Sequence, residues 1–141
     1  MKASEFSPQV GAQGVASWVV GPEHLADALG NDGVMVLATP MLLDLMEIAA
    51  DRALSSALPK DWVTLGTLAD FKHLKLTPLG FQVTARATVT AVDRQKIRFQ
   101  IEVHDDLDLI GEGWHERFCL PKEDFLAMVQ AKRAARPTSE K

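Results

Sequence analysis

The second half of the sequence alternates between apolar and polar residues, and this pattern limits the possible folds more than any other feature. Every second residue is apolar in FQVTARATV (81–89) and again in IRFQIEV (97–103). Because successive side chains of a strand point to opposite faces of the sheet, this period predicts antiparallel strands with one covered face. Strand-like sequence also occurs at 62–71 and at 109–120, where two glycines indicate a bend or bulge. We therefore expect four strands in a meander.

One long apolar helix precedes these strands. It begins at the Thr39–Pro40 pair and continues to about residue 57, before Pro59. Threonine is a good helix cap, and proline suits the first helical turn, where its missing N–H is not needed. Shorter elements are expected around it: a strand at 14–21, a helix at 22–30, a loop at 31–34 and a closing helix at 122–135.

This order of elements predicts an α+β layer in which the sheet can wrap around the long helix. The pattern alone does not choose among α+β folds. A chain of 141 residues is most simply one domain with a sizeable core. We assign that domain to residues 13–135, with a flexible arm at 1–12 and a tail at 136–141.

Glu47 lies among the leucines and methionines of the long helix. At ~100° per residue, one side of this helix gathers four apolar residues, Leu43, Met46, Ala50 and Leu54. A polar stripe runs along another side, through Asp44, Asp51 and Ser55. Glu47 falls between the two sides. It is either the rim of the polar stripe or a carboxylate held for chemistry, since burying an unpaired charge is costly.

Composition excludes several classes of partner and site. The net charge is −4 and Lys and Arg form no long run, which argues against nucleic acid or an anionic membrane as the main partner. Cys119 is the only cysteine, so no intrachain disulfide can form. His104 and His115 lack a third ligand at metal spacing, and we expect no metal. The chain shows no signal peptide and no apolar run long enough to span a bilayer, so we expect a cytoplasmic protein.

Three stretches form a recognisable set: ATPMLLDLMEIAADRAL (38–54), LGTLADFKHLKLTPLG (65–80) and VHDDLDLIGEGWHERF (103–118). In order and spacing, this set resembles the fluoroacetyl-CoA thioesterase-like branch of the hot-dog fold thioesterase superfamily. The match covers roughly residues 15–129. It implies a hot-dog fold, in which an antiparallel sheet wraps around one long central helix. It also implies hydrolysis of an acyl-coenzyme A to a carboxylic acid and free coenzyme A.

The resemblance further implies which residues carry the reaction. The family uses a threonine, a glutamate and a histidine, and the matching positions are Thr39, Glu47 and His73. Glu47 would act as a base or attack the thioester directly to form an anhydride. Thr39 would position water or carry the acyl group, and His73 would orient the carboxylate or protonate the thiolate. Gly66 matches a family glycine near the acyl end, and Arg117, in the HER stretch, is expected to contact the substrate.

The sequence departs from the family in the lid ahead of the long helix. Members that handle fluoroacetate carry bulky aromatic residues there, whereas GNDGVMVL (30–37) contains Gly30 and Gly33 and no aromatic residue. We expect Gly33 to lie at the substrate. We also expect a more open or more mobile pocket that admits a different acyl group.

Two other functions fit the same sequence. One is a hydratase or dehydratase acting on acyl thioesters, and the other is a non-catalytic acyl-thioester binding protein. In each case the partner is a small acyl-CoA molecule, with coenzyme A as part of the substrate and no separate cofactor. A single hot-dog unit leaves a sheet edge and a helix flank uncovered, so we expect a homodimer or a dimer of dimers, with the site at the dimer interface as in the family.

Overall fold

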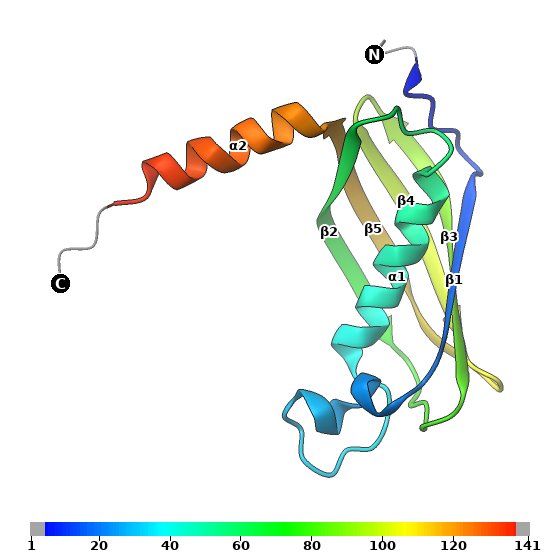
Figure 1. Cartoon of the computed structure of the whole chain (residues 1–141). Coiled ribbons are helices and arrows are strands. Elements are labelled where there is room, and N and C mark those ends of the chain that lie inside the picture. The colour runs from blue at the N-terminus through cyan, green and yellow to red at the C-terminus, as the bar shows by residue number, and fades with distance from the viewer. Residues whose placement is uncertain (1–4, 138–141) are drawn as a thin grey trace.

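A computed structural model describes residues 5–137 (Figure 1). An antiparallel sheet with strand order β1-β3-β4-β5-β2 curls around the long helix α1. The strands are β1 (Gln13–Val19), β2 (Trp62–His73), β3 (Gln82–Asp93), β4 (Lys96–His104) and β5 (Leu109–Pro121). The helices are α1 (Thr39–Leu54) and α2 (Lys122–Ala135), and two 3-10 turns, η2 (Pro22–His24) and η3 (Ala26–Leu29), lie between β1 and α1. The predicted α+β hot-dog fold is confirmed.

The core lies between α1 and the concave face of the sheet. The predicted alternation holds on the two central strands, which bury Val83, Ala85, Ala87 and Val89 of β3 and Ile97, Phe99, Ile101 and Val103 of β4. The helix buries an arc formed by Leu42, Leu45, Met46, Ala49, Ala50, Ala53 and Leu54. Leu43, expected in the core, is only partly buried. The reason is that α1 packs mainly on β1 and β3, which leaves its other flank less covered.

The predicted strands do not form a simple meander. β3, β4 and β5 pair in sequence order, but β2 pairs with β5 and lies at the opposite edge of the sheet from β1. Alternation shows which face of a strand is covered but carries no information about which strand lies beside it. Within residues 5–137, the outer edge of β2 pairs with no other strand.

The segment 22–30 does not form the single short helix that the sequence predicts. It forms two 3-10 turns separated by Leu25, whose backbone is extended with φ −83° and ψ 149°. Leu25 is 2% exposed and forms an isolated antiparallel bridge with Leu37. Burial of this one side chain therefore interrupts the helix that the local sequence favours.

The two ends of the chain differ in how they meet the domain. In the described part of the N-terminal arm, Ser7 and Gly11 donate backbone hydrogen bonds to Ala57 and Val89. Residues 1–4 of the expected arm and 138–141 of the expected tail lie outside the described residues. At the other end, α2 extends away from the sheet, and none of its side chains is buried (Figure 1).

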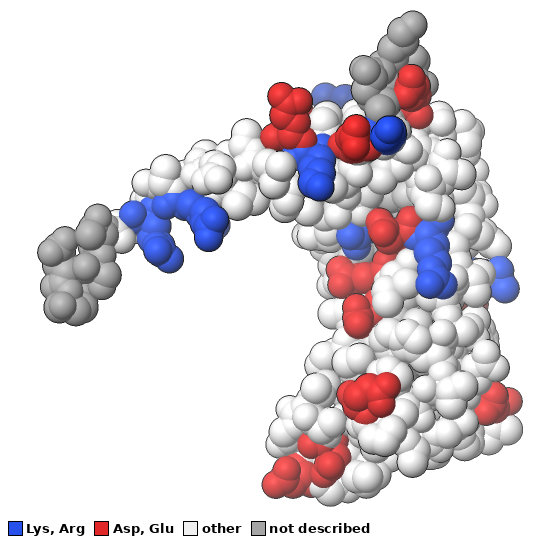
Figure 2. All heavy atoms as spheres, viewed as in Figure 1, with Lys and Arg blue, Asp and Glu red and all other residues white. Residues whose placement is uncertain are grey.

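The projecting helix α2 is polarised in charge. Its first turn is acidic, and its last turn carries Lys132 and Arg133. Figure 2 shows Lys and Arg side chains gathered toward the far end of this helix, whereas acidic side chains are spread over the body of the domain. Neither α1 nor α2, nor any other helix of residues 5–137, has the length and apolar character needed to cross a bilayer.

Candidate active site

The side chains of Thr39 and His73 meet at the start of α1. Thr39 is the first residue of that helix, and His73 is the last residue of β2. The Oγ1 and Nδ1 atoms of these residues are 2.7 Å apart, which is a short hydrogen bond. The expected role of Thr39 as a helix cap is wrong, because the N-cap position is Ala38 and no side chain caps the helix. The hydroxyl of Thr39 is hydrogen-bonded to His73 instead.

The second ring nitrogen of His73 has no hydrogen-bond partner in the part of the chain that the structure describes. Nε2 is buried and makes no hydrogen bond within residues 5–137. Burial also lowers the pKa of His73 below its ordinary value, because desolvation disfavours the charged ring. Thr39 and His73 line a cavity of about 350 Å³. An unpaired polar atom beside a cavity indicates a binding site, since a ligand can supply the missing partner.

Glu47 belongs to a second group of polar residues, two turns further along α1. Its Oε2 atom lies 3.6 Å from Nη1 of Arg117, and its side chain is 41% exposed. Gly66 lies against the carboxylate: a Cβ atom added at this glycine would be 2.6 Å from Oε2. A side chain at position 66 would therefore displace the carboxylate, and the glycine leaves the space that Glu47 occupies.

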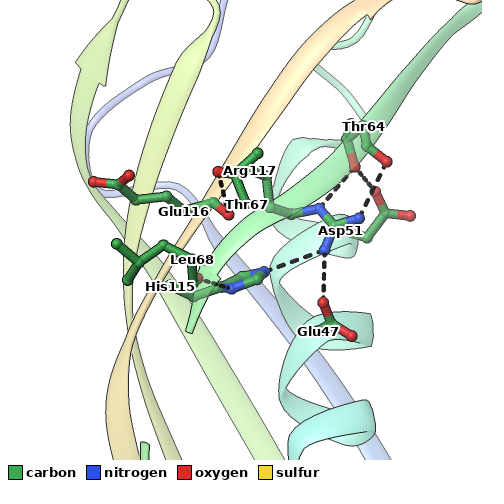
Figure 3. A network of polar contacts seen from close by, with 8 residues as sticks. All are labelled: Glu47, Asp51, Thr64, Thr67, Leu68, His115, Glu116 and Arg117. Carbon is green, nitrogen blue, oxygen red and sulfur yellow. Dashed lines mark hydrogen bonds and ion pairs between the residues drawn. The ribbon is translucent and has the colours of Figure 1, made fainter. Parts of the chain in front are cut away.

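Arg117 is fixed by further contacts (Figure 3). Its Nε and Nη2 atoms donate to the hydroxyl and the carbonyl oxygen of Thr64, at 2.8 and 3.2 Å. Its Nη1 atom lies 3.2 Å from Nε2 of His115. Thr64 in turn donates its hydroxyl hydrogen to Asp51 at 2.8 Å. The Arg117 side chain is only 11% exposed, so the guanidinium expected to contact substrate is largely engaged inside the protein, beside Glu47.

Five of the six residues expected at the site, all except Gly33, thus form two groups within one chain. One group joins Thr39 to His73, and the other joins Glu47 to Gly66 and Arg117. Since Thr39 and Glu47 are eight residues apart on α1, about 12 Å of helix axis separates them. No hydrogen bond joins Glu47 to Thr39 or His73 in the described part of the chain, so the expected orienting of the carboxylate by His73 is not seen in a single copy.

The lid ahead of α1 is held by hydrogen bonds. The backbone N–H groups of Ala26 and Asp27 donate to the carbonyls of Val36 and Val34, at 2.8 and 2.9 Å. The Asp27 side chain accepts a hydrogen bond from the N–H of Gly33 at 2.8 Å. Gly33 has φ 85°, a conformation that favours glycine. Val34 and Val36 line the cavity beside His73, whereas Gly33 is not among the residues lining it, and no Phe, Tyr or Trp of the described chain contributes to its wall.

Sequence reasoning did not place three members of the Glu47 group at the site: Asp51, which was assigned only to the polar stripe, His115, which was considered only as a metal ligand, and Thr64. The available signal was the period of β5, which places residues 115 and 117 on one face of the strand. That signal became useful only once β5 was known to pair with β2 under α1. Among residues 5–137, no group of three His, Cys, Asp or Glu side chains could hold a metal ion.

Sequence comparison connects this geometry to known enzymes. The profile of the fluoroacetyl-CoA-specific thioesterase family matches residues 20–123. A fluoroacetyl-CoA thioesterase of Streptantibioticus cattleyicolor is 36% identical over 100 residues, which make up 71% of this chain and 72% of that protein.

Solved structures agree with the sequence comparison. A mutant of the fluoroacetyl-CoA-specific thioesterase matches with a TM-score of 0.83 at 31% identity, over 89% of this chain and 98% of that chain. Another mutant of that enzyme, in complex with acetyl-CoA, matches with a TM-score of 0.82 at 31% identity, over 88% and 98% of the two chains. A thioesterase superfamily member from Thermus thermophilus gives a TM-score of 0.84 at 25% identity, over 91% and 95%. The chain belongs to the fluoroacetyl-CoA-specific thioesterase family, within the hot-dog thioesterase superfamily.

Proposed function

We propose that this chain hydrolyses the thioester bond of an acyl-CoA, releasing a carboxylic acid and free coenzyme A. The observation that carries the proposal is the short hydrogen bond between Thr39 and His73 beside a cavity, with the second nitrogen of His73 buried and unpaired within residues 5–137. Membership of a thioesterase family supports the same reaction.

The Thr39–His73 pair is suited to moving a proton at the thioester. When the hydroxyl of Thr39 donates to Nδ1, the proton of the neutral ring is on Nε2, at the unpaired position. This N–H can bind the thioester and then protonate the departing thiolate. The lowered pKa of His73 keeps the ring neutral at pH 7. The N-terminus of α1 adds a dipole that favours the negative charge developing on the carbonyl oxygen.

Glu47 brings about the attack on the carbonyl carbon by one of two routes. As a base, it removes a proton from water, which adds to the carbonyl carbon. As a nucleophile, it adds to that carbon itself and forms an anhydride, which water then opens. In both routes a C–O bond forms, the C–S bond breaks, and the thiolate leaves with a proton. Arg117 fixes the carboxylate from one side.

A second copy of the chain, we propose, completes the site. The uncovered features lie together: the outer edge of β2, the run of exposed residues Gly66–Asp70 within it, and the flank of α1 that carries Leu43 and Glu47. Pairing β2 with β2 of a second copy continues the sheet and covers this flank. Since Gly66 lies in the first half of β2 and His73 at its end, antiparallel pairing brings the His73 end of one copy toward the Gly66 half of the other.

Mixing two inactive variants tests this shared site. Thr39→Ala and Glu47→Gln are each expected to abolish most turnover. If each site takes Thr39 from one copy and Glu47 from the other, a mixed dimer holds one intact site. An equal mixture, unfolded and refolded together, then recovers about a quarter of wild-type turnover, because half of the dimers are mixed. No recovery in a mixture shown to contain mixed dimers would place both residues in the same copy.

The reaction itself is tested by thiol release across a panel of acyl-CoA substrates of increasing chain length. Release of free thiol by the wild type, and its loss in Glu47→Gln, supports hydrolysis. A change in enoyl absorbance without thiol release would support a hydratase instead. Saturable binding of acyl-CoA without turnover would support a binding protein.

A further inference from the structure

His115 lies at the centre of the Glu47 group, yet the proposed reaction does not use it. It is on β5, it is 1% exposed, and its ring lies near the rings of Phe71 and Phe99, with centroid distances of 6.1 and 6.0 Å. Both ring nitrogens nevertheless have polar partners. A buried histidine bonded at both nitrogens is held in one tautomer, and that tautomer defines what it can position.

The partners of His115 fix the location of its proton. Nδ1 lies 2.7 Å from the carbonyl oxygen of Leu68, and because a carbonyl can only accept, Nδ1 carries the hydrogen. Nε2 then presents a lone pair and accepts a hydrogen bond from Nη1 of Arg117 at 3.2 Å. Burial lowers the pKa of His115, and the positive charge of Arg117 acts in the same direction. The ring is therefore a neutral acceptor facing the guanidinium.

The carbonyl that His115 binds adjoins a β-bulge. The register between β2 and β5 shifts between Gly66 and Leu68, so Thr67 has no partner across the strand pair. A bulge re-aims the residues beside it. Here the residue beside it is Gly66, whose missing side chain leaves room for the carboxylate of Glu47. One imidazole thus connects the bulge to the guanidinium (Figure 3).

We propose that His115 is a positioning residue, which acts through Arg117 to hold the Glu47 carboxylate in place for thioester hydrolysis. The inference rests on the proposed function of Glu47. Thr64 holds Nε and Nη2 of the guanidinium, whereas His115 holds Nη1, the nitrogen nearest Glu47. Without this acceptor, Nη1 has the carboxylate as its one remaining partner in the described chain, and the guanidinium, still bound to Thr64 through Nε and Nη2, is held less firmly and rotates more readily.

Three substitutions separate the two hydrogen bonds of His115. His115→Phe keeps a ring between Phe71 and Phe99 but removes both bonds. His115→Gln places an amide oxygen where Nε2 was, so it can still accept from Arg117. His115→Asn places an amide N–H where Nδ1 was, so it can still donate to Leu68 but does not reach Arg117. We expect kcat to fall about 10- to 100-fold in His115→Phe and His115→Asn with KM changed less than about threefold, and His115→Gln to keep more turnover than either.

A readout independent of turnover is the side-chain NMR spectrum of Arg117 in ¹⁵N-labelled protein. Rotation of a guanidinium bound at all three nitrogens is slow, so the wild type should show separate Nη signals, which should merge in His115→Phe. Val83→Ala is the matched control, because Val83 is fully buried on β3, which pairs with neither β5 nor β2. It should lower the melting temperature while leaving kcat and the Arg117 signals unchanged.

The outcomes distinguish this inference from the proposed function. A wild-type chain that hydrolyses no acyl-CoA would overturn the proposed function. If the wild type is active, a folded His115→Phe variant with kcat within about twofold of it overturns the positioning role, as do unmerged Arg117 signals in that variant. Recovery of kcat by His115→Asn as fully as by His115→Gln assigns His115 to the bulge alone and overturns its action through Arg117.

Discussion

The hydroxyl of Thr39 is bonded to the ring of His73 and not to the backbone of the helix that it begins. Threonine before proline at a helix start normally caps that helix, and the loss of a cap costs about 1 kcal/mol. In this chain no side chain caps α1, so the hydroxyl of Thr39 does not stabilise the helix in that way. The stability and the activity of variants at this position are therefore separable.

Thr39→Ala should lower turnover strongly and change stability little. The change removes the partner of His73, and we expect kcat to fall by ~10²-fold, a typical loss for a group that handles a proton. Thr39→Ser keeps the hydroxyl and should keep most of the turnover. Thiol release and thermal melts of the purified variants measure both effects. A drop of several degrees in Tm for Thr39→Ala, as expected for a lost cap, would contradict this account.

Glu47→Gln removes the ionisable oxygen but keeps the shape of the side chain. Turnover should fall by ~10²-fold or more if Glu47 is the base or nucleophile. The free energy of unfolding should change by less than about 1 kcal/mol, because the partly exposed ion pair with Arg117 at 3.6 Å contributes little. Combined with His73→Ala, the total loss should be smaller than the product of the single losses if the residues act as one unit. A folded Glu47→Gln variant with near-normal turnover would leave Glu47 as the rim of the polar stripe.

Gly66→Ala should disturb the carboxylate and not the fold. The new Cβ would lie 2.6 Å from Oε2 of Glu47, and that carboxylate, at the end of a flexible side chain, can move away. We expect kcat to fall while the melting temperature stays nearly constant. The control is the same substitution in the Glu47→Gln background, where it should cost much less turnover. Equal losses in the two backgrounds would mean that Gly66 acts independently of Glu47.

One buried histidine, His115, and one partly buried histidine, His73, should make the fold sensitive to mild acid. Burial lowers the pKa of both His73 and His115 from the ordinary value of 6.5. As the pH falls below that value, the unfolded chain binds protons that the folded chain does not, so stability is full above it and falls below it. The slope is at most about 1.4 kcal/mol per pH unit for each histidine. Urea unfolding at pH 7.5 and pH 5.5 measures it, and His115→Phe should show a smaller slope; an unchanged slope would mean that His115 does not contribute.

Fluoroacetyl-CoA should not be strongly preferred over acetyl-CoA. The cavity beside His73 has an aliphatic wall that includes Val34 and Val36, and no aromatic side chain of the described chain closes it. Distinguishing a single fluorine requires close contact, which such a wall does not supply. The measurement is kcat/KM for the two substrates under the same conditions. A large preference for fluoroacetyl-CoA would show that selectivity does not need an aromatic lid.

The fold was largely predictable because burial leaves a regular trace in the sequence. The alternation in 81–89 and 97–103 marked the covered faces of β3 and β4, and the apolar run after Thr39 marked α1. What failed depends on tertiary packing. Leu25 breaks a local helix because its side chain is buried, and β2 crosses to the far edge of the sheet, which no periodicity records.

The candidate site was predictable by resemblance more than by physics. The helical wheel did not decide whether Glu47 is the rim of the polar stripe or a carboxylate held for chemistry, because a wheel describes one helix and not the strands packed against it. The neighbours that give Glu47 its setting come from β2 and β5, and their meeting depends on a strand register with a bulge beside Gly66. In the lid ahead of α1, the two glycines predicted a more open or more mobile segment. The structure instead shows the N–H of Gly33 donating a hydrogen bond to the side chain of Asp27.

Because α2 projects away from the rest of the domain, the protein has two regions that unfold at different free-energy costs. A helix of 14 residues that buries no side chain is marginal in water, so α2 can unravel while the sheet and α1 stay folded. Its amide hydrogens should exchange with solvent far sooner than those of β3 and β4. Trypsin should first cut next to Lys132 and Arg133 and release a trimmed domain that still melts as a unit.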